Sequence, residues 1–213
     1  MLRTSTADFV PSRPAVSRDP EVLTKAWALP SARRYAPLRS QSFAAICGPT
    51  SVANVLRSIT GDARRNPLRG PGFRPMTVEQ LAREADEVVP DDWAVTVVRP
   101  STVEALRDEL RASNHEHRRV VANFSRAAIF GRGGGHHSPI GGYLEEEDLA
   151  FVLDVNASYG PWLVSTERLF DAVKTFDSSG TRLRGLARFE RLTGTRLTGT
   201  RLTGTSSTHA HQR

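Results

Sequence analysis

The feature that most constrains the fold of this chain is a change in the spacing of its apolar residues about halfway along. In the first half they recur every three or four residues, as Val52, Val55 and Ile59 do, and this spacing is typical of amphipathic helices. From Val120 onward they come in short β-prone runs instead. Helices followed by antiparallel strands predict an α+β domain rather than alternating βαβ units.

The individual elements can be placed from their cap and turn residues. The pattern predicts helices that start near Cys47, Thr77, Ser101 and Thr166, and strands over 120–124, 138–144 and 149–155. Gln80 follows Thr77 by three residues, which is the spacing of a capping box. The acidic stretch 145–148 separates the last two strands, so we expect it to be the turn of a hairpin.

The two ends of the chain differ from the part between them. Residues 1–37 contain several Pro and Ser and one short helical pattern near 21–28, and we interpret them as an N-terminal arm. From Arg191 the sequence RLTGT occurs three times in succession, and such a repeat buries little apolar surface. We therefore expect residues 190–213 to be a disordered tail and residues 38–189 to form one folded domain.

Composition and charge set limits on the function. The net charge is +6, and almost all basic residues are Arg, since Lys occurs only at Lys25 and Lys174. These arginines are scattered among acidic residues, so we expect no dedicated nucleic-acid binding, although a non-catalytic Arg-rich binding module stays open as an alternative. The sequence has no apolar run near the ~20 residues of a membrane span and no secretory signal pattern. We expect no membrane contact and a cytoplasmic location.

Cys47 is the only cysteine, so its surroundings decide whether it is a core residue or a nucleophile. A helix N-terminus lowers the pKa of a thiol, and Pro49 is favoured in a first helical turn. Gly48 would let a substrate approach the backbone. The alternative is that Cys47 is buried as a small hydrophobe, as free cysteines usually are. A single cysteine excludes an intramolecular disulfide and a cysteine-built zinc site.

Two of the six histidines are candidate partners for this thiol. We expect His115 and His117 to be solvated in a charged stretch, and His209 and His211 to be solvated in the tail. His136 and His137 remain, after a glycine-rich loop and directly before a predicted strand.

The predicted hairpin offers a geometric test of these two histidines. His136 and Asp154 are the same number of residues before and after Glu145 in the acidic turn. Regular antiparallel pairing about that centre places them directly opposite each other on one face of the hairpin. His137 then points to the other face. A bulge at Gly141-Gly142 would shift this register by one residue.

These residues predict acyl transfer at an amide bond by a catalytic triad. Cys47 attacks the carbonyl as a thiolate, His136 holds its proton and delivers it to the leaving amine, and Asp154 orients the imidazole. The side-chain amide of Gln41 would stabilise the developing oxyanion together with the backbone N–H of Cys47. The alternative for Gln41 is an ordinary loop residue.

At these positions the chain resembles the phytochelatin synthase family, papain-fold enzymes that act on glutathione. The segments that carry the resemblance are QSFAAICG, GHHSPIGGY and LAFVLDV. In the family the functional histidine stands two places before the serine, which is His136 here, and His137 takes a position that the family often fills with an apolar residue. The family's histidine-to-aspartate separation falls on Asp154. Asn123 and Arg126 resemble the Asn-x-x-Arg of bacterial members, without an assigned role.

The resemblance implies a papain-like cysteine-protease fold with the nucleophile at a helix N-terminus and an antiparallel sheet that carries His and Asp. It also implies cleavage of the Cys-Gly bond of glutathione through a γ-glutamylcysteinyl thioester on Cys47, with transfer to water or to a second glutathione. After Asp154 the family usually has an Arg and a Tyr-Pro-Pro stretch, whereas this chain reads NASYGPW. The same triad acting on a different amide or thioester therefore stays open.

No cofactor held by the protein is implied. The eukaryotic members' Cys-rich region has no counterpart in this sequence, so Cd or Zn would enter as a glutathione thiolate complex in a metal-detoxification role. The expected partner is the small-molecule substrate glutathione, and a homodimer stays open.

Overall fold

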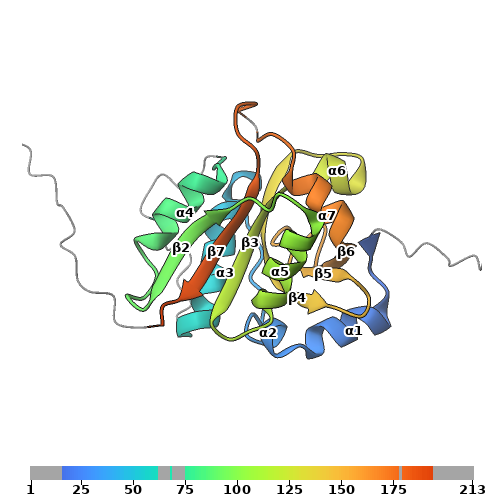
Figure 1. Ribbon diagram of the computed structural model, residues 1–213, viewed down its shortest axis with the longest axis horizontal. Coiled ribbons are helices and arrows are strands. Elements are labelled where there is room, and N and C mark those ends of the chain that lie inside the picture. Colours follow the sequence, from blue (N-terminus) through green and yellow to red (C-terminus); the bar gives the residue numbers. More distant parts are fainter. Residues whose placement is uncertain (1–15, 62–67, 69–74, 178, 194–213) are drawn as a thin grey trace, which may run out of the picture.

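The computed structural model describes residues 16–61, 68, 75–177 and 179–193, and in them one antiparallel sheet carries helices on both faces (Figure 1). The strand order is β1-β6-β5-β4-β3-β7-β2. The strands are β1 (Val16–Ser17), β2 (Trp93–Val98), β3 (Arg118–Ser125), β4 (Gly135–Leu144), β5 (Leu149–Val152), β6 (Trp162–Ser165) and β7 (Gly185–Arg191). The helices are α1 (Pro20–Ala28), α2 (Pro30–Arg33), the 3-10 helix η1 (Ala44–Ile46), α3 (Cys47–Thr60), α4 (Val78–Asp86), α5 (Val103–Ser113), α6 (Arg126–Phe130) and α7 (Thr166–Val173). This mixture confirms the predicted α+β class.

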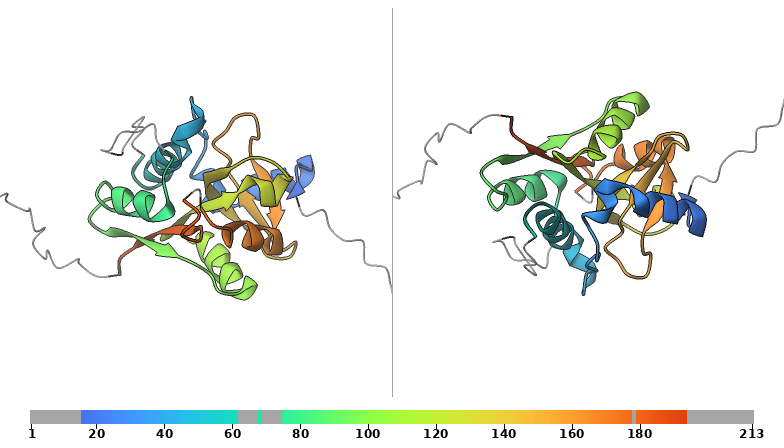
Figure 2. Two further views of the ribbon diagram at one scale, coloured as in Figure 1. Left: turned by 90° about the horizontal axis from the view of Figure 1, so that it is seen from above. Right: turned by 90° about the horizontal axis from the view of Figure 1, so that it is seen from below.

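The sheet separates two hydrophobic clusters. Figure 2 shows α3 and α4 on one side of the sheet and α5 and α7 on the other. Neighbouring residues of β3 point to opposite faces, so Val121 belongs to the same cluster as Val52 of α3, while Val120 belongs to the same cluster as Leu169 of α7. β3 and β4 lie in the middle of the sheet, and residues near the start of β4 can therefore meet side chains from either layer.

Helix α3 confirms the helix predicted from Cys47 and ends at Thr60, where the C-cap Gly61 has a left-handed φ of 76°. Gly48 has a different role from the one predicted. It is buried, and a Cβ there would lie 3.2 Å from Leu81 Cδ1 and 3.3 Å from Met76 Sδ. Gly48 therefore lets α4 and the segment before it pack closely against the first turn of α3, rather than opening the backbone to a substrate.

The predicted caps are right in one helix and displaced by one residue in two. Thr77 and Gln80 form the predicted capping box of α4. Helix α5 is capped by Thr102 instead of Ser101, and α7 by Ser165 instead of Thr166. In both cases two hydroxyl residues are adjacent, and the cap is the one whose hydroxyl accepts from the N–H three residues further on, Ala105 in α5 and Arg168 in α7.

Strands β2, β6 and β7 were not predicted. The sequence GLARFER of β7 mixes charged residues with apolar ones, yet β7 pairs with both β2 and β3. β7 includes Glu190 and Arg191, which the sequence assigned to the tail; residues 194–213 lie outside the described residues. In the N-terminal arm, α1 and α2 pack on the sheet, and Ala26 and Ala32 are fully buried. The first fifteen residues also lie outside the described part.

The hairpin of β4 and β5 has the predicted acidic turn but not the predicted register. Ile140 pairs with Val152 and Gly142 with Phe151, so a bulge lies between them. β5 ends at Val152, and His136 and Asp154 are not a cross-strand pair. The prediction of direct opposition was wrong because the turn is centred between Glu146 and Glu147 instead of at Glu145, as the pairs Leu144–Leu149 and Tyr143–Ala150 show.

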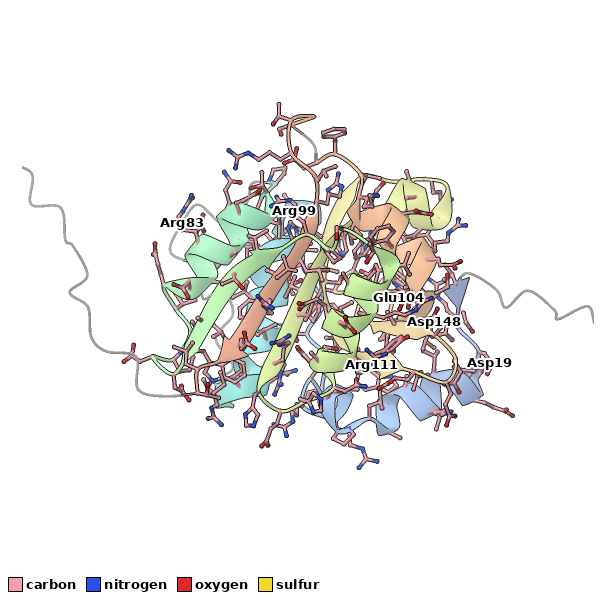
Figure 3. The ribbon with its side chains drawn as sticks, viewed as in Figure 1. Asp19, Arg83, Arg99, Glu104, Arg111 and Asp148 are labelled. Carbon is pink, nitrogen blue, oxygen red and sulfur yellow. The ribbon has the colours of Figure 1, made fainter. Side chains whose placement is uncertain are left out.

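Helix α5 holds the acidic turn through its arginines. Arg107 Nη2 lies 2.6 Å from Asp148 Oδ2, and Arg111 Nε lies 3.0 Å from Glu145 Oε2. Figure 3 labels Arg111 and Asp148 on the side of the molecule that α5 covers. The backbone of Asp148 is left-handed, with φ of 53°, and its ion pair anchors this tight turn. None of the helices described here combines the length and apolar character needed to cross a bilayer.

Candidate active site

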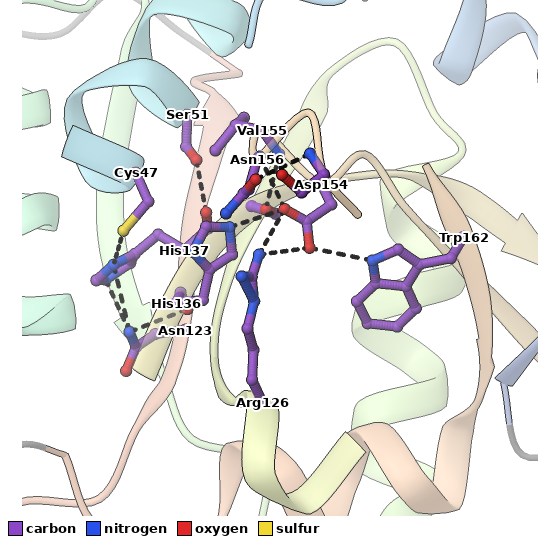
Figure 4. A network of polar contacts seen from close by, with 12 residues as sticks. Cys47, Ser51, Asn123, Arg126, His136, His137, Asp154, Val155, Asn156 and Trp162 are labelled. Atoms are coloured by element: carbon purple, nitrogen blue, oxygen red, sulfur yellow. Dashed lines mark hydrogen bonds and ion pairs between the residues drawn. The ribbon is translucent and has the colours of Figure 1, made fainter. Parts of the chain in front are cut away.

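Cys47 lies at the N-terminal end of α3, directly after η1, where its thiol is partly exposed. Its Sγ is 3.9 Å from Nδ1 of His137 (Figure 4). The ring of His136 also interacts with the sulfur. Burial alone would raise the pKa of Cys47. Hydrogen bonds with His136 and then His137 outweigh burial and lower the pKa to about 5. At neutral pH the sulfur is therefore a thiolate, the reactive form of a cysteine.

His136 connects the thiolate to a buried carboxylate. The ring is 4% exposed, and its Nε2 lies 3.0 Å from Asp154 Oδ1. This is ion-pair distance, although the geometry is not that of a well-aligned hydrogen bond. Burial lowers the pKa of His136, but Asp154 and then Cys47 outweigh burial and raise it. A raised histidine pKa beside a lowered cysteine pKa favours an imidazolium–thiolate pair.

Asp154 is held by several donors just beyond the end of β5. It is 1% exposed, and Arg126 Nη2 lies 2.7 Å from both of its carboxylate oxygens. Trp162 Nε1 donates to Oδ2 at 3.1 Å, and the backbone N–H of Asn156 donates to Oδ1 at 2.9 Å. Burial raises the pKa of Asp154, while His136 and then Arg126 outweigh it and lower the pKa. The carboxylate is therefore ionised and fixed in place.

The segment after Asp154, where the sequence departs from the resembled family, covers Arg126. The guanidinium carbon of Arg126 lies 3.9 Å from the centre of the Tyr159 ring. The loop turns on Asn156, which accepts hydrogen bonds from the backbone N–H groups of Ser158, Tyr159 and Gly160. In this chain the segment thus closes over the arginine that holds Asp154.

His137 lies against α3 rather than away from the site. As regular pleating predicts, its ring is on the other face from His136, which packs edge-on against Phe124 at 5.6 Å. That other face is the one on which Cys47 lies, because α3 packs there. Ser51 of α3 donates to the backbone carbonyl of His137 at 3.1 Å. Both histidines therefore belong to the surroundings of the sulfur.

Gln41 is joined to the site by its backbone. Its N–H donates to the carbonyl of Val155 at 2.7 Å, which ties the segment before Cys47 to the residue after Asp154. Its side-chain Oε1 is buried and has no hydrogen-bond partner among the described residues. The predicted oxyanion role of Gln41 stays a prediction.

Sequence reasoning missed several residues that support the site. Arg126 and Asn123 were singled out only as a motif, and Trp162, Tyr159 and Arg184 were not singled out at all. A signal existed for Trp162, because a buried indole N–H needs an acceptor and Asp154 precedes it by only eight residues. Arg184 gave no such signal, since it is distant in sequence from Asn123, which it contacts.

An ionised cysteine at a helix start, two buried histidines and a buried carboxylate on an α+β domain define a cysteine–histidine–acid site. The family model described as Phytochelatin synthase matches residues 74–186, more than half of the chain. The chain therefore belongs to the phytochelatin synthase family, which confirms the resemblance seen in the sequence. The matched range contains His136 and Asp154, and Cys47 lies before it.

Relatives in plants carry the name glutathione gamma-glutamylcysteinyltransferase. The chain is 32% identical over 173 residues to glutathione gamma-glutamylcysteinyltransferase 2 of Arabidopsis thaliana. The aligned region covers 72% of this chain and 38% of that protein. It is 29% identical over 172 residues to glutathione gamma-glutamylcysteinyltransferase 1 of Triticum aestivum, and the aligned region covers 72% of this chain and 34% of that protein. It is 35% identical over 94 residues to glutathione gamma-glutamylcysteinyltransferase 3 of Lotus japonicus, and the aligned region covers 43% of this chain and 20% of that protein. The chain spans well under half the length of each of these relatives.

Proposed function

We propose that this chain is a papain-like cysteine enzyme that cleaves the Cys-Gly bond of glutathione and transfers the γ-glutamylcysteinyl group to water or to a second glutathione. The observation that carries the proposal is the low pKa of Cys47, about 5, beside His136, which is itself ion-paired with buried Asp154. The family and the names of the plant relatives supply the substrate class. The roles below are those that this geometry supports.

In the first half-reaction the thiolate of Cys47 attacks the carbonyl carbon of the Cys-Gly peptide bond. The oxyanion that forms accepts hydrogen bonds from the backbone N–H of Cys47 and from the side-chain amide of Gln41. The imidazolium of His136 gives its proton to the glycine nitrogen, the C–N bond breaks and glycine leaves. A γ-glutamylcysteinyl thioester remains on Cys47.

In the second half-reaction His136, now neutral, accepts a proton from water or from the amino group of a second glutathione. The activated oxygen or nitrogen attacks the thioester carbonyl, the C–S bond breaks and Cys47 leaves as a thiolate beside the restored imidazolium. Water yields γ-glutamylcysteine, and glutathione yields a chain lengthened by one γ-glutamylcysteinyl unit. Asp154, held by Arg126 and Trp162, keeps the ring of His136 oriented through both steps.

Cadmium or zinc enters this proposal as part of the substrate, bound to the thiolates of glutathione. The described part of the chain contains no group of three or more His, Cys, Asp or Glu side chains that could hold a metal ion. We expect the metal to act by converting glutathione into a thiolate complex that binds as acyl acceptor or donor.

The test is product analysis with the purified chain and glutathione, with and without cadmium or zinc. Free glycine is expected together with γ-glutamylcysteine or the lengthened peptide. The Cys47→Ala variant is expected to release none, because the acyl-enzyme cannot form, and a mass increase of one γ-glutamylcysteinyl group is expected only when Cys47 is present. A folded protein whose Cys47→Ala variant still releases glycine at the original rate would refute the proposal.

A second candidate is the same triad acting on a different amide or thioester. The observation that favours it is the segment 155–161, in which Tyr159 stacks on Arg126 and no arginine follows Val155. Incubation with other γ-glutamyl peptides and with simple thioesters, followed by mass analysis of Cys47, separates the two candidates. The substrate that acylates Cys47 with the highest kcat/KM identifies the acyl donor.

The Arg-rich binding module is less well supported. Many arginines of the described surface are paired with carboxylates, namely Arg99 with Glu79, Arg107 with Asp148, Arg111 with Glu145, Arg188 with Glu109 and Arg191 with Asp92. Paired arginines offer less attraction to an acidic partner. Alkylation of Cys47 by iodoacetamide near pH ~6 supports catalysis, whereas an inert thiol near the reference pKa of about 8.5 supports the binding module.

A further inference from the structure

We infer that Ser138 is a positioning residue for Asp154: its buried hydroxyl holds the peptide unit that follows Asp154 and thereby keeps the carboxylate against His136. The inference rests on the proposed function, because the position of Asp154 affects a reaction only if His136 carries the catalytic proton. Sequence reasoning gave this serine no role, although it lies in one of the segments that resemble the family.

The hydrogen-bond ladder between β4 and the chain that follows β5 stops just before Val155. The N–H of Leu153 donates to the carbonyl of Pro139 at 2.9 Å, as in a regular antiparallel pair. In a continued ladder the next bonds would join Val155 to His137, two residues further along each segment. Both residues bind other groups instead. The chain therefore separates from β4 at the point where Asp154 lies.

Three contacts take the place of those ladder bonds. The N–H of Val155 donates to Oγ of Ser138 at 3.3 Å, and its carbonyl accepts from the N–H of Gln41 at 2.7 Å. The carbonyl of His137 accepts from Oγ of Ser51 at 3.1 Å (Figure 4). Val155 thus joins β4 to the segment that leads to the nucleophile, and Ser138 supplies the β4 side of this junction.

Ser138 lies on the same face of β4 as the histidine that Asp154 contacts. It is two residues from His136, and residues two apart in a strand point to one face. Ser138 and Val155 are both fully buried. A buried N–H without an acceptor is costly, so loss of the Ser138 hydroxyl favours movement of the Val155 peptide toward another acceptor.

This movement would reach the carboxylate because Asp154 is bound to its own main chain. The N–H of Val155 belongs to the peptide unit that begins at Cα of Asp154. The N–H of Asn156 donates to Oδ1 at 2.9 Å, and Oδ1 is the atom that lies 3.0 Å from Nε2 of His136. A shift of residues 154–156 therefore shifts that oxygen.

The contact with His136 is the one that tolerates such a shift least. The guanidinium of Arg126, which binds both carboxylate oxygens, ends a side chain with several rotatable bonds and can follow the carboxylate. The His136 ring is part of the central strand β4 and packs edge-on against Phe124 at 5.6 Å. Ser138 thus sets the distance between Asp154 and His136.

The test compares Ser138→Ala with Ser113→Ala. Ser113 of α5 is 2% exposed, and its hydroxyl donates to the carbonyl of Leu110 at 2.6 Å, away from the site. Each variant loses one buried hydrogen bond, and each is expected to lower Tm by about 2–4 °C. Only Ser138→Ala is expected to lower kcat, by about tenfold with KM changed less than about twofold, because it misplaces a group of the reaction without touching substrate.

A second measurement needs no glutathione. Burial lowers the pKa of His136, but Asp154 and then Cys47 outweigh burial and raise it. Ser138→Ala is expected to lower the pKa of His136 by about half a unit, because the carboxylate that stabilises the imidazolium is displaced. Ser113→Ala should leave that pKa unchanged. NMR titration of the histidine ring protons measures it, and a merely structural role of Ser138 would lower Tm without this shift.

The outcomes separate the inference from the proposed function. A lower kcat and a lower pKa of His136 in Ser138→Ala alone support the inference, and an unchanged pKa overturns it. Should Ser138→Ala fail to fold, Ser138→Cys is judged by the same two measurements, because a thiol is similar in shape and a weaker acceptor. If the unaltered chain releases no glycine from glutathione while the pKa of His136 still falls in the variant, the proposed function fails and the role of Ser138 stands.

Discussion

The β4–β5 hairpin has an aspartate–arginine pair at each of its ends, and the two pairs have different roles. At the turn, Asp148 pairs with Arg107 and also accepts hydrogen bonds from Tyr143 Oη at 2.7 Å and from the hydroxyl of Thr166. This cluster joins the turn to α5 and α7. It is a structural anchor.

At the other end Asp154 pairs with Arg126 and Trp162 in much the same way, but it also contacts His136. Its side chain is fully buried, whereas that of Asp148 is 36% exposed. Both carboxyl groups have a lowered pKa despite burial, which raises it. A lowered pKa therefore marks a strongly held carboxylate, and the neighbouring histidine and thiol indicate which one takes part in chemistry.

The sharpest test of this comparison replaces each aspartate by asparagine. Asp154→Asn is expected to lower glycine release by about 10³–10⁴-fold, because an amide beside His136 no longer stabilises the imidazolium or fixes its tautomer. Asp148→Asn is expected to keep activity within about threefold, because its contacts lie in the turn. Both are measured as kcat with saturating glutathione. Equal activities in the two variants would contradict the assignment of Asp154.

The second test removes each arginine. Arg126→Met leaves the buried carboxylate of Asp154 without its cation, and we expect a loss of ~3–5 kcal/mol in the free energy of unfolding. Arg107→Met breaks a more exposed pair, and we expect a loss of ~0.2–1 kcal/mol. Urea unfolding followed by circular dichroism measures both. If Arg126→Met were as stable as Arg107→Met, Asp154 would be better solvated than its burial indicates.

The sequence was sufficient to predict which hairpin carries His136 and Asp154, but not how they meet. The apolar runs and the acidic turn predicted two adjacent strands correctly. The cross-strand pairing was wrong because the turn is centred between Glu146 and Glu147 rather than at Glu145, whereas the bulge between Ile140 and Gly142 changes the register by only one residue. Asp154 reaches His136 from beyond the strand, held there by Arg126 and Trp162.

The second histidine shows a different limit of sequence reasoning. Alternation along β4 predicted correctly that His137 points to the face opposite His136. The sequence did not predict that Cys47 sits where both rings reach it, because that depends on how α3 packs on the sheet. Asn123 and Arg184 lie in β3 and just before β7, so their meeting is a long-range contact that no local pattern encodes.

The third test removes one neutral donor from each carboxylate. Trp162→Phe deletes the N–H that binds Asp154 and is expected to cost ~1.5–3 kcal/mol of unfolding free energy, since the acceptor is a buried charge. Tyr143→Phe deletes the O–H that binds Asp148, and ~0.5–1.5 kcal/mol is expected because that carboxylate is partly solvated. The same urea unfolding experiment compares the losses of unfolding free energy in the two variants. Trp162→Phe should also lower kcat, and Tyr143→Phe should not.

The smallest expected effect is an acid-dependent loss of stability at the turn. The pKa of Asp148 is raised by burial, but Arg107, then Thr166 and Tyr143, outweigh burial and lower it from 3.8 to about 2. Because the pKa of Asp148 is lower in the folded than in the unfolded chain, its ionised carboxylate stabilises the fold. This stabilisation is complete above about pH 4 and disappears as the pH falls through about 2. Because the Asp148 side chain is 36% exposed and solvent screens its pair, we expect the contribution to be only ~1 kcal/mol. The free energy of unfolding, measured by urea titration between pH ~5 and ~2, should fall less steeply in Asp148→Asn than in the unaltered chain. An identical slope in both proteins would mean that Asp148 titrates alike in the folded and unfolded states, and the turn would then owe its stability to the backbone alone.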